Sequence, residues 1–238
     1  MIAPIFFICK KNKMRYYAIV VAGGTGNRMQ NTVAKQFLLI ENRPVLMHTL
    51  EAFHKCVLNP DIILVMNIHQ QTYWKELCDT YNFNIPHLLI DGGKERFDSV
   101  KNGLDRIEGE GIVAIHDAVR PLVSASLILR TFQMAAQNGN AVAAIQPVDS
   151  VRRKTTANAT EAINRDELFL IQTPQTFQIS QLRKAYLQVF RNDFTDDASV
   201  VEKAGFSINL VEGERTNIKI TYPQDLELAS FLLRKTGF

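Results

Sequence analysis

The sequence has little cysteine, no block of like charge and no long apolar run. Its three cysteines, Cys9, Cys56 and Cys78, are widely spaced and form no Cys-x-x-Cys pair, which favours reduced thiols over disulfides or a zinc site. The five histidines show no metal-ligand spacing. Lysines and arginines form no basic stripe with interleaved aromatic residues, so we expect no nucleic-acid partner.

The amino terminus has no export or membrane signal. Residues 1–9 contain a short apolar stretch, but basic residues follow it, which is the reverse of a secretory signal. No stretch of the sequence reaches the length that spans a bilayer. We therefore expect residues 1–13 to be a disordered extension, and the protein to be cytoplasmic with no membrane partner.

Apolar runs alternate with amphipathic patterns through most of the 238 residues. We expect strands at 17–22, 61–67, 87–90, 112–116, 141–146 and 207–211. We expect helices at 45–56, 72–81, 97–107 and 126–137. This alternation predicts an α/β fold with a doubly wound, mostly parallel sheet in one domain, residues 14–238. Ligands of such folds bind beyond the carboxyl ends of the strands.

Residues 148–172 interrupt this rhythm. Two polar, alternating segments, 150–155 and 161–164, flank a polar loop, which is the pattern of a β-hairpin. An isolated two-stranded ribbon is only marginally stable in water. The segment is therefore either a surface excursion or an arm that packs on a partner subunit, and we favour the arm.

A glycine-rich turn follows the first expected strand. It reads Ala-Gly-Gly-Thr-Gly-Asn-Arg-Met over residues 22–29, and Lys-Gln-Phe follows at 35–37. Glycines let backbone N–H groups approach an anion, and Arg28 and Lys35 add positive charge. No lysine stands where a P-loop needs one, and Met29 replaces the third glycine of the dinucleotide fingerprint. The pattern favours a nucleoside triphosphate over a plain tight turn.

Four further motifs carry polar chemistry. Asp117 ends the fourth strand, where it could approach Mg²⁺ or a substrate hydroxyl, or simply pair with the loop and Arg120. A second glycine turn at 91–93 leads into a helix, whose free N–H groups suit an anion or a base edge. Residues 195–199 read as a helix cap with two carboxylates in the first turn. Lys219 lies between two isoleucines and points opposite to them.

Together and in this order, these motifs resemble the family of cytidylyltransferases that act on 2-C-methyl-D-erythritol 4-phosphate in the non-mevalonate isoprenoid pathway. The resemblance runs from about residue 17 to the carboxyl terminus. The matching segments are residues 22–29, 35–37, 91–93, 95–96, 98–100, 116–121, 172–175, 195–199 and 217–219. The ribitol-5-phosphate cytidylyltransferases, a sister family, share some of these motifs. A nucleotide-sugar pyrophosphorylase and a non-catalytic nucleotide-binding module are two further hypotheses.

The resemblance implies a Rossmann-like fold with a protruding β-hairpin arm at about 148–172, and a homodimer formed through that arm. It implies CTP and a polyol phosphate as substrates, with Mg²⁺ or another divalent cation. It assigns catalysis to Arg28, Lys35, Lys219 and, from the neighbouring subunit's arm, Arg165. It assigns CTP binding to Ala22, Gly23, Gly24, Thr25, Gly26, Gly93 and Ser99. It assigns substrate contacts to Asp117, Arg120, Ser150, Thr173 and Thr195, with Asp117 also a candidate near the metal.

In the arm, the family tends to carry a threonine where this sequence has Ser150, which keeps the hydroxyl and loses the methyl. Lys94 stands where an aspartate can occur in the family, so no ribose contact is expected from that side chain.

Overall fold

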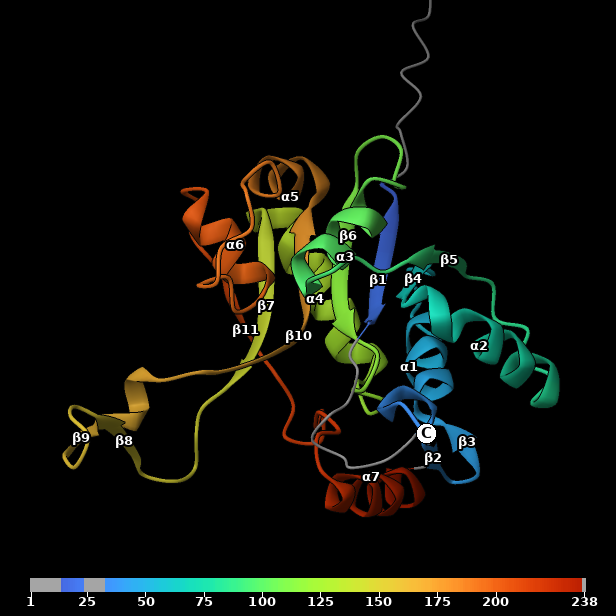
Figure 1. The fold of residues 1–238 in the computed structure, drawn as a ribbon. Helices are drawn as coiled ribbons and strands as arrows, with labels where there is room; N and C mark the ends of the chain where they lie inside the picture. Colours follow the sequence, from blue (N-terminus) through green and yellow to red (C-terminus); the bar gives the residue numbers. More distant parts are fainter. Residues whose placement is uncertain (1–13, 24–32, 237–238) are drawn as a thin grey trace, which may run out of the picture.

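A seven-stranded sheet lies at the centre of the protein (Figure 1). The computed structural model describes residues 14–23 and 33–236. Within them the strand order is β11-β7-β10-β6-β1-β4-β5, and β10 runs antiparallel to both neighbours while all other pairings are parallel. The strands are β1 (Tyr16–Ala22), β4 (Asp61–Met66), β5 (Leu88–Asp91), β6 (Ile112–Asp117), β7 (Asn140–Ile145), β10 (Leu170–Gln178) and β11 (Leu210–Glu212). The predicted mostly parallel, doubly wound sheet is confirmed.

Helices cover both faces of this sheet (Figure 1). One face packs on α1 (Val45–His54), α2 (Ile68–Thr80) and α4 (Ala125–Asn138), around Phe53, Trp74 and Phe132. The other packs on α3 (Arg96–Leu104), α5 (Ile179–Ala185) and α6 (Asp197–Lys203), around Phe97 and Leu182. Successive residues of the apolar strands alternate between these two clusters, because side chains of a strand point to opposite faces.

A third, smaller apolar cluster lies beyond the carboxyl ends of the parallel strands. It joins α7 (Pro223–Thr236) to the short ribbon formed by β2 (Leu39–Ile40) and β3 (Arg43–Pro44), through buried residues such as Ile40, Ile220 and Leu233. The 3₁₀ turn η2 (Lys35–Phe37) lies on the same side, close to α1. This cluster therefore closes the end of the sheet at which a ligand is expected.

Strand β10 was not predicted, and it begins inside the range expected for the arm. Its sequence is polar and contains Pro174, which has no N–H to donate. Its pairing with β7 shifts register between Ile171 and Gln175, which is where a proline can be accommodated in a central strand. Helices α5 and α7 also lay outside the predicted elements.

The predicted hairpin is present and stands apart from the sheet (Figure 1). Its strands, β8 (Val151–Lys154) and β9 (Thr160–Ile163), pair antiparallel with each other, and the turn η3 (Arg165–Glu167) follows them. Most of the side chains in both strands are exposed. The fold is therefore a Rossmann-like sheet with a protruding β-arm, as predicted.

Candidate functional site

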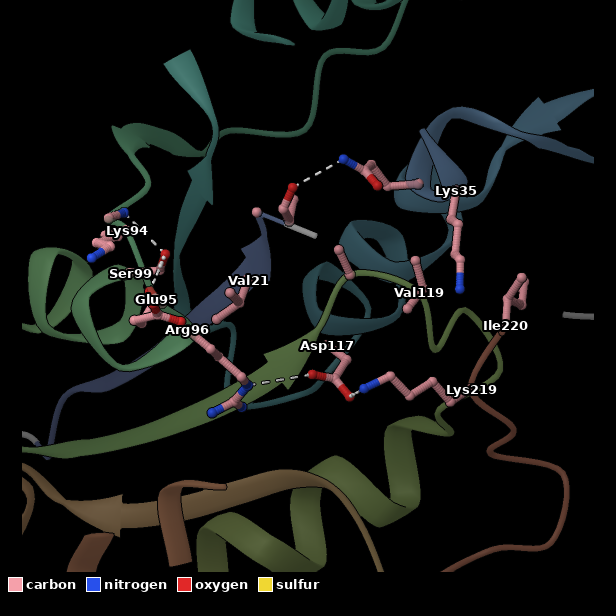
Figure 2. Close-up of a pocket in the computed structure, with 15 residues that line it drawn as sticks. Val21, Lys35, Lys94, Glu95, Arg96, Ser99, Asp117, Val119, Lys219 and Ile220 are labelled. Carbon is pink, nitrogen blue, oxygen red and sulfur yellow. Dashed lines mark hydrogen bonds and ion pairs between the residues drawn. The ribbon is translucent and has the colours of Figure 1, made fainter. Parts of the chain in front are cut away.

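A pocket opens where the carboxyl ends of β1 and β6 meet, which is the point where the strand order reverses direction (Figure 2). Motifs that lie far apart in the sequence contribute to it. Its lining residues are Val21, Ala22, Gly23, Lys35, Gln36, Gly93, Lys94, Glu95, Arg96, Ser99, Asp117, Ala118, Val119, Lys219 and Ile220. The structure therefore brings Lys35, Lys219, Asp117 and the second glycine turn together in one pocket, and their roles there stay predictions.

Asp117 is the anionic centre of the pocket. Lys219 Nζ lies 2.9 Å from its Oδ2, Arg120 Nε lies 3.5 Å from the same oxygen, and Arg96 Nε lies 3.8 Å from Oδ1. Burial opposes ionisation of this carboxyl, but the three cations outweigh it and hold its pKa well below the usual range. The carboxylate is therefore charged and already surrounded by protein cations.

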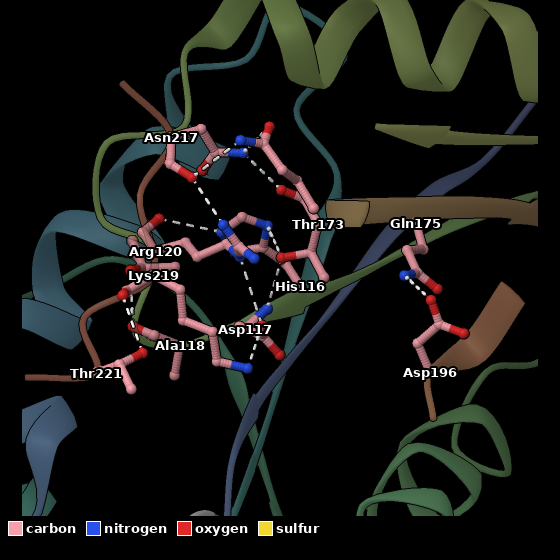
Figure 3. Close-up of polar contacts among 12 residues, drawn as sticks. His116, Asp117, Ala118, Arg120, Thr173, Gln175, Asp196, Asn217, Lys219 and Thr221 are labelled. Carbon is pink, nitrogen blue, oxygen red and sulfur yellow. Dashed lines mark hydrogen bonds and ion pairs between the residues drawn. The ribbon is translucent and has the colours of Figure 1, made fainter. Parts of the chain in front are cut away.

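His116 supports Asp117 from within the core (Figure 3). Its Nε2 lies 3.1 Å from the Arg120 carbonyl oxygen and its Nδ1 lies 3.0 Å from Thr173 Oγ1. Burial lowers the pKa of His116 to about 4, so the ring is neutral. Because a carbonyl only accepts, Nε2 carries the proton and Nδ1 accepts from the Thr173 hydroxyl. That hydroxyl in turn accepts the Asp117 N–H at 3.1 Å.

Thr173 and Arg120 were predicted to contact substrate, but their polar groups are engaged inside the protein. The Thr173 side chain is buried in the chain just described. Arg120 donates from Nη1 to the Asn217 carbonyl at 2.7 Å, and neither residue lines the pocket. Both predicted contacts stay predictions, and what the structure shows is support of the loop that carries Asp117.

Residues 217–221 carry Lys219 at the pocket and contact Lys35 there. The Ile220 N–H donates to the Val119 carbonyl at 2.9 Å, which docks this segment against the loop after β6. Lys35 Nζ donates to the Thr221 carbonyl, also at 2.9 Å. The buried Asn217 amide anchors the segment to β10 by donating to the Thr173 carbonyl at 2.8 Å. One short segment thus places Lys219 and fixes Lys35.

The second glycine turn packs tightly against the start of α3. A Cβ built on Gly93 would lie 2.2 Å from Asp98 Cβ, so only glycine fits there. The Gly93 N–H donates to Ser99 Oγ at 3.0 Å, and Ser99 Oγ donates to the Glu95 carbonyl at 3.1 Å. Ser99 Oγ also faces the first glycine turn, 3.6 Å from the position of a Cβ on Gly23.

Much of the first glycine turn lies outside the described residues, including Gly24, Thr25, Gly26 and Arg28. Ala22 and Gly23 do line the pocket. The Ala22 carbonyl accepts from Gln36 Nε2 at 2.9 Å, and the same amide donates to Gln70 Oε1 at 2.8 Å. No role was predicted for Gln36, although it lies directly beside Lys35.

Arg96 is another pocket residue for which the sequence predicted no role. It donates from Nη1 and Nη2 to both oxygens of Asp197, at 2.8 Å and 2.6 Å. Asp197 was expected to lie in the first turn of α6 only as a capping charge. Its side chain is instead fully buried, and Asp196 caps the helix by accepting the Ser199 N–H. Thr195 is exposed and lies beside this pair, outside the lining of the main pocket.

Arg165 and Ser150 belong to the arm, whose strands β8 and β9 stand away from the central sheet (Figure 1), and neither residue lines the pocket. Arg165 is half-exposed and donates from Nη1 to the Val148 carbonyl at 2.6 Å. Ser150 precedes β8 and is exposed. Their predicted contacts with substrate therefore stay predictions.

No cluster of three or more histidine, cysteine or carboxylate side chains suitable for a metal occurs within 14–23 and 33–236. Asp117 alone fits a Mg²⁺ ligand poorly, because protein cations already engage both of its oxygens. A divalent cation here would take most of its ligands from the phosphates of a bound nucleotide. In the same described part of the chain, no helix has the length and apolar character needed to cross a membrane.

The sequence of this chain is similar to that of one family of known proteins over almost its whole length. The profile of the family IspD, 2-C-methyl-D-erythritol 4-phosphate cytidylyltransferase, matches residues 16–235. The enzyme of that name from Bacteroides fragilis is 50% identical over 216 residues, which cover 91% of this chain and 98% of the relative. The one from Bacteroides thetaiotaomicron is 47% identical over 220 residues, covering 92% and 100%.

Solved structures of the same kind share the fold. The crystal structure of 4-diphosphocytidyl-2C-methyl-D-erythritol synthase from Anaerococcus prevotii superposes with a TM-score of 0.79 at 27% identity, covering 93% of this chain and 99% of that one. The cytidylyltransferase from Thermus thermophilus gives a TM-score of 0.76 at 28% identity, covering 93% and 100%. This chain belongs to the 2-C-methyl-D-erythritol 4-phosphate cytidylyltransferase (IspD) family.

Proposed function

We propose that this protein couples CTP to 2-C-methyl-D-erythritol 4-phosphate, giving 4-diphosphocytidyl-2-C-methyl-D-erythritol and pyrophosphate. The observation that carries the proposal is the meeting of Lys35, Lys219 and Asp117 at the carboxyl ends of β1 and β6, in a chain of this family. Two lysines beside one buried carboxylate suit the binding of phosphate groups next to hydroxyl groups.

The reaction is an in-line attack of a substrate phosphate oxygen on the α-phosphorus of CTP. A phosphomonoester has a second pKa of about 6, so it is already largely dianionic at neutral pH and needs no general base. His116 fits this scheme because its ring is buried and both nitrogens are engaged. The protein's task is to bring two anions together and to stabilise the charge that develops.

The two lysines take different parts in this task. Lys35, together with Arg28, stabilises the transition state and the departing pyrophosphate, while the backbone of residues 23–26 holds the triphosphate. Lys219 positions the attacking phosphate, and Asp117 holds a hydroxyl of the same substrate. The fixed position of Lys35 on the Thr221 carbonyl and of Lys219 on Asp117 supports this division.

Cytosine binds between the two glycine turns, at backbone groups of Ala22 and Gly93 with help from Ser99. The enclosure of Ser99 between these turns supports this placement. Arg120, Thr173 and Thr195 are the remaining candidates for substrate contact within the subunit. The structure gives the first two a supporting role as well.

A divalent cation, with Mg²⁺ the first choice, accompanies CTP and supplies charge neutralisation at its phosphates. Protein cations already pair with both oxygens of Asp117, which supports a metal ion bound mainly by the phosphates of the nucleotide and not by this carboxylate. No step of the scheme depends on a protein ligand to the metal.

The arm joins two copies of the chain into a homodimer and presents Arg165, with Ser150, to the neighbouring pocket. Exposed apolar side chains at the base of the arm support this role, since Val148, Phe169 and Leu170 are 62%, 47% and 52% exposed. In this proposal residues 14–238 form one catalytic domain with a dimerisation arm, residues 1–13 are an extension, and the enzyme acts in the cytoplasm, where CTP is available.

The deciding experiment measures pyrophosphate release with CTP and Mg²⁺ for 2-C-methyl-D-erythritol 4-phosphate and, separately, for D-ribitol 5-phosphate. We expect a strong preference for the first substrate. Preference for ribitol phosphate would keep the mechanism and refute the assigned substrate. Absence of turnover with both would refute the proposed reaction.

A further inference from the structure

Arg96 joins two motifs that are 101 residues apart in the sequence. It is the first residue of α3, directly after the second glycine turn, and its guanidinium reaches the first residue of α6, Asp197. Both Nη atoms donate to that carboxylate, at 2.8 Å and 2.6 Å, in the two-bond arrangement that fixes orientation as well as distance. The guanidinium therefore has one defined position at the wall of the pocket.

Asp197 is itself held firmly in place. Its side chain is fully buried, and Tyr186 donates its hydroxyl to Oδ1 at 2.6 Å. From the sheet, Gln175 accepts the Ala198 N–H at 2.8 Å and donates to Asp196 Oδ2 at 2.9 Å. The start of α6 is thus tied to β10, and it presents a rigid anion to Arg96.

The remaining nitrogen of Arg96, Nε, faces the reaction site (Figure 2). It lies 3.8 Å from Oδ1 of Asp117. Lys219 and Arg120 approach the other oxygen, Oδ2, at 2.9 Å and 3.5 Å. The carboxylate is therefore attracted by positive charge from both sides, with Arg96 on the Oδ1 side.

We propose that Arg96 is a positioning residue that acts through Asp117 and serves the polyol phosphate. Its attraction for Oδ1 keeps the carboxylate facing the pocket and competes with the hold of Oδ2 on Lys219, which lies 2.9 Å away, so that Lys219 can transfer to the attacking phosphate. This inference rests on the proposed roles of Asp117 and Lys219. It gives the motif at 195–199 the task of holding Arg96.

The test compares Arg96→Gln, Asp117→Asn and the double variant by steady-state kinetics with both substrates. We expect Arg96→Gln to raise KM for the polyol phosphate about fivefold or more while KM for CTP stays within about twofold. Because Arg96 acts through Asp117, the double variant should have a kcat/KM within about twofold of that of Asp117→Asn alone. Equal changes in both KM values, or additive losses in the double variant, would overturn the inference.

Two further variants separate positioning from stability. Arg96→Gln leaves a buried carboxylate without its partner, so Arg96→Gln/Asp197→Asn removes both charges, and the same kinetic pattern is expected from it. The matched control is Arg183→Gln, because Arg183 donates to the carbonyls of Ile107 and Gly109, before β6 begins. We expect this control to lower the melting temperature and leave both KM values unchanged.

The outcome also distinguishes this inference from the proposed function. Ordinary kinetics for Asp117→Asn and Lys219→Ala would refute the roles proposed for those residues. Wild-type kcat and KM values for Arg96→Gln, together with impaired values for Asp117→Asn, would refute the positioning role alone.

Discussion

At the scale of single residues, Asp117 shows how the pocket controls charge before substrate arrives. Its carboxylate lies close to three cations, and one of them, Lys219, is half-exposed and open to the pocket. In the proposed mechanism, a phosphate that enters competes with this carboxylate for Lys219, and the competition limits how tightly the ground state binds. Interactions that strengthen only as charge develops are those that raise the rate.

The first prediction at this scale concerns Lys35→Ala. We expect turnover to fall by at least about tenfold, because in the proposed mechanism Lys35 supplies charge that stabilises the transition state. Pyrophosphate release measures the rate, and circular dichroism checks the fold. The matched control is Lys55→Ala, which removes a half-exposed lysine paired with Glu51 on α1. Near-normal turnover of Lys35→Ala would remove the catalytic role proposed for this residue.

His116 leads to a prediction about stability. Burial lowers the pKa of the folded-state ring from 6.5 to about 4, so between these pH values the unfolded chain binds the extra proton. Stability is therefore full above about pH 6.5 and falls as the pH is lowered towards 4. Between pH 7 and pH 4.5 the wild type should lose about 2 kcal/mol more unfolding free energy than His116→Gln.

Urea unfolding of both proteins at the two pH values measures this difference. Glutamine suits the comparison because it does not titrate and can still donate and accept hydrogen bonds. Parallel losses of stability in the two proteins would show that the ring contributes nothing to acid sensitivity.

At the scale of elements, the predictable parts of the fold were those with continuous apolar runs. Strands such as β1, β4 and β6 are buried on both faces, and their sequences show it directly. Strand β10 was missed because its buried polar side chains are satisfied by distant partners. Gln172 donates to the Glu214 carbonyl, and Gln175 forms hydrogen bonds with the start of α6. Such partners lie far away along the chain, and no local pattern reports them.

The same limit applies to the candidate site. Lys35, Lys219 and Asp117 could be named as candidates because each lies in a short sequence motif that resembles the family. The pairing of Arg96 with Asp197 could not, since acidic residues at the start of a helix are fully explained by capping. Only the contact in space between Arg96, at the start of α3, and Asp197, at the start of α6, distinguishes a buried ion pair from a surface cap.

The arm gives the prediction that belongs to this scale. If Arg165 works in the neighbouring subunit's pocket, Arg165→Ala should raise KM for the polyol phosphate and leave the fold intact. Co-expression of Arg165→Ala with Lys35→Ala should restore about a quarter of wild-type activity, because half of the dimers are mixed and each has one complete site. Each variant expressed alone is the control, and absence of rescue would show that the arm acts within its own subunit.

At the scale of the whole molecule, the proposed dimer can be tested directly. The hairpin strands contact little besides each other, and the apolar base of the arm is exposed in a single chain. We expect sedimentation velocity to give a dimer at micromolar concentration. Leu170→Glu, which places a charge at the base of the arm, should shift the protein towards the monomer and lower turnover with it. A clean monomer in the wild type would undercut the arm hypothesis.

The docking of residues 217–221 makes the pocket depend on a segment that follows the last strand of the central sheet. Within the described residues every strand of the central sheet ends by Glu212, so the residues that form the sheet all precede Lys219 in the chain. Lys35, which lies near the beginning of the chain, also donates its hydrogen bond to this late segment, at the Thr221 carbonyl. A chain truncated after the last strand would keep the nucleotide turns and lack the lysine that, in the proposed mechanism, positions the second substrate, so we expect it to be inactive.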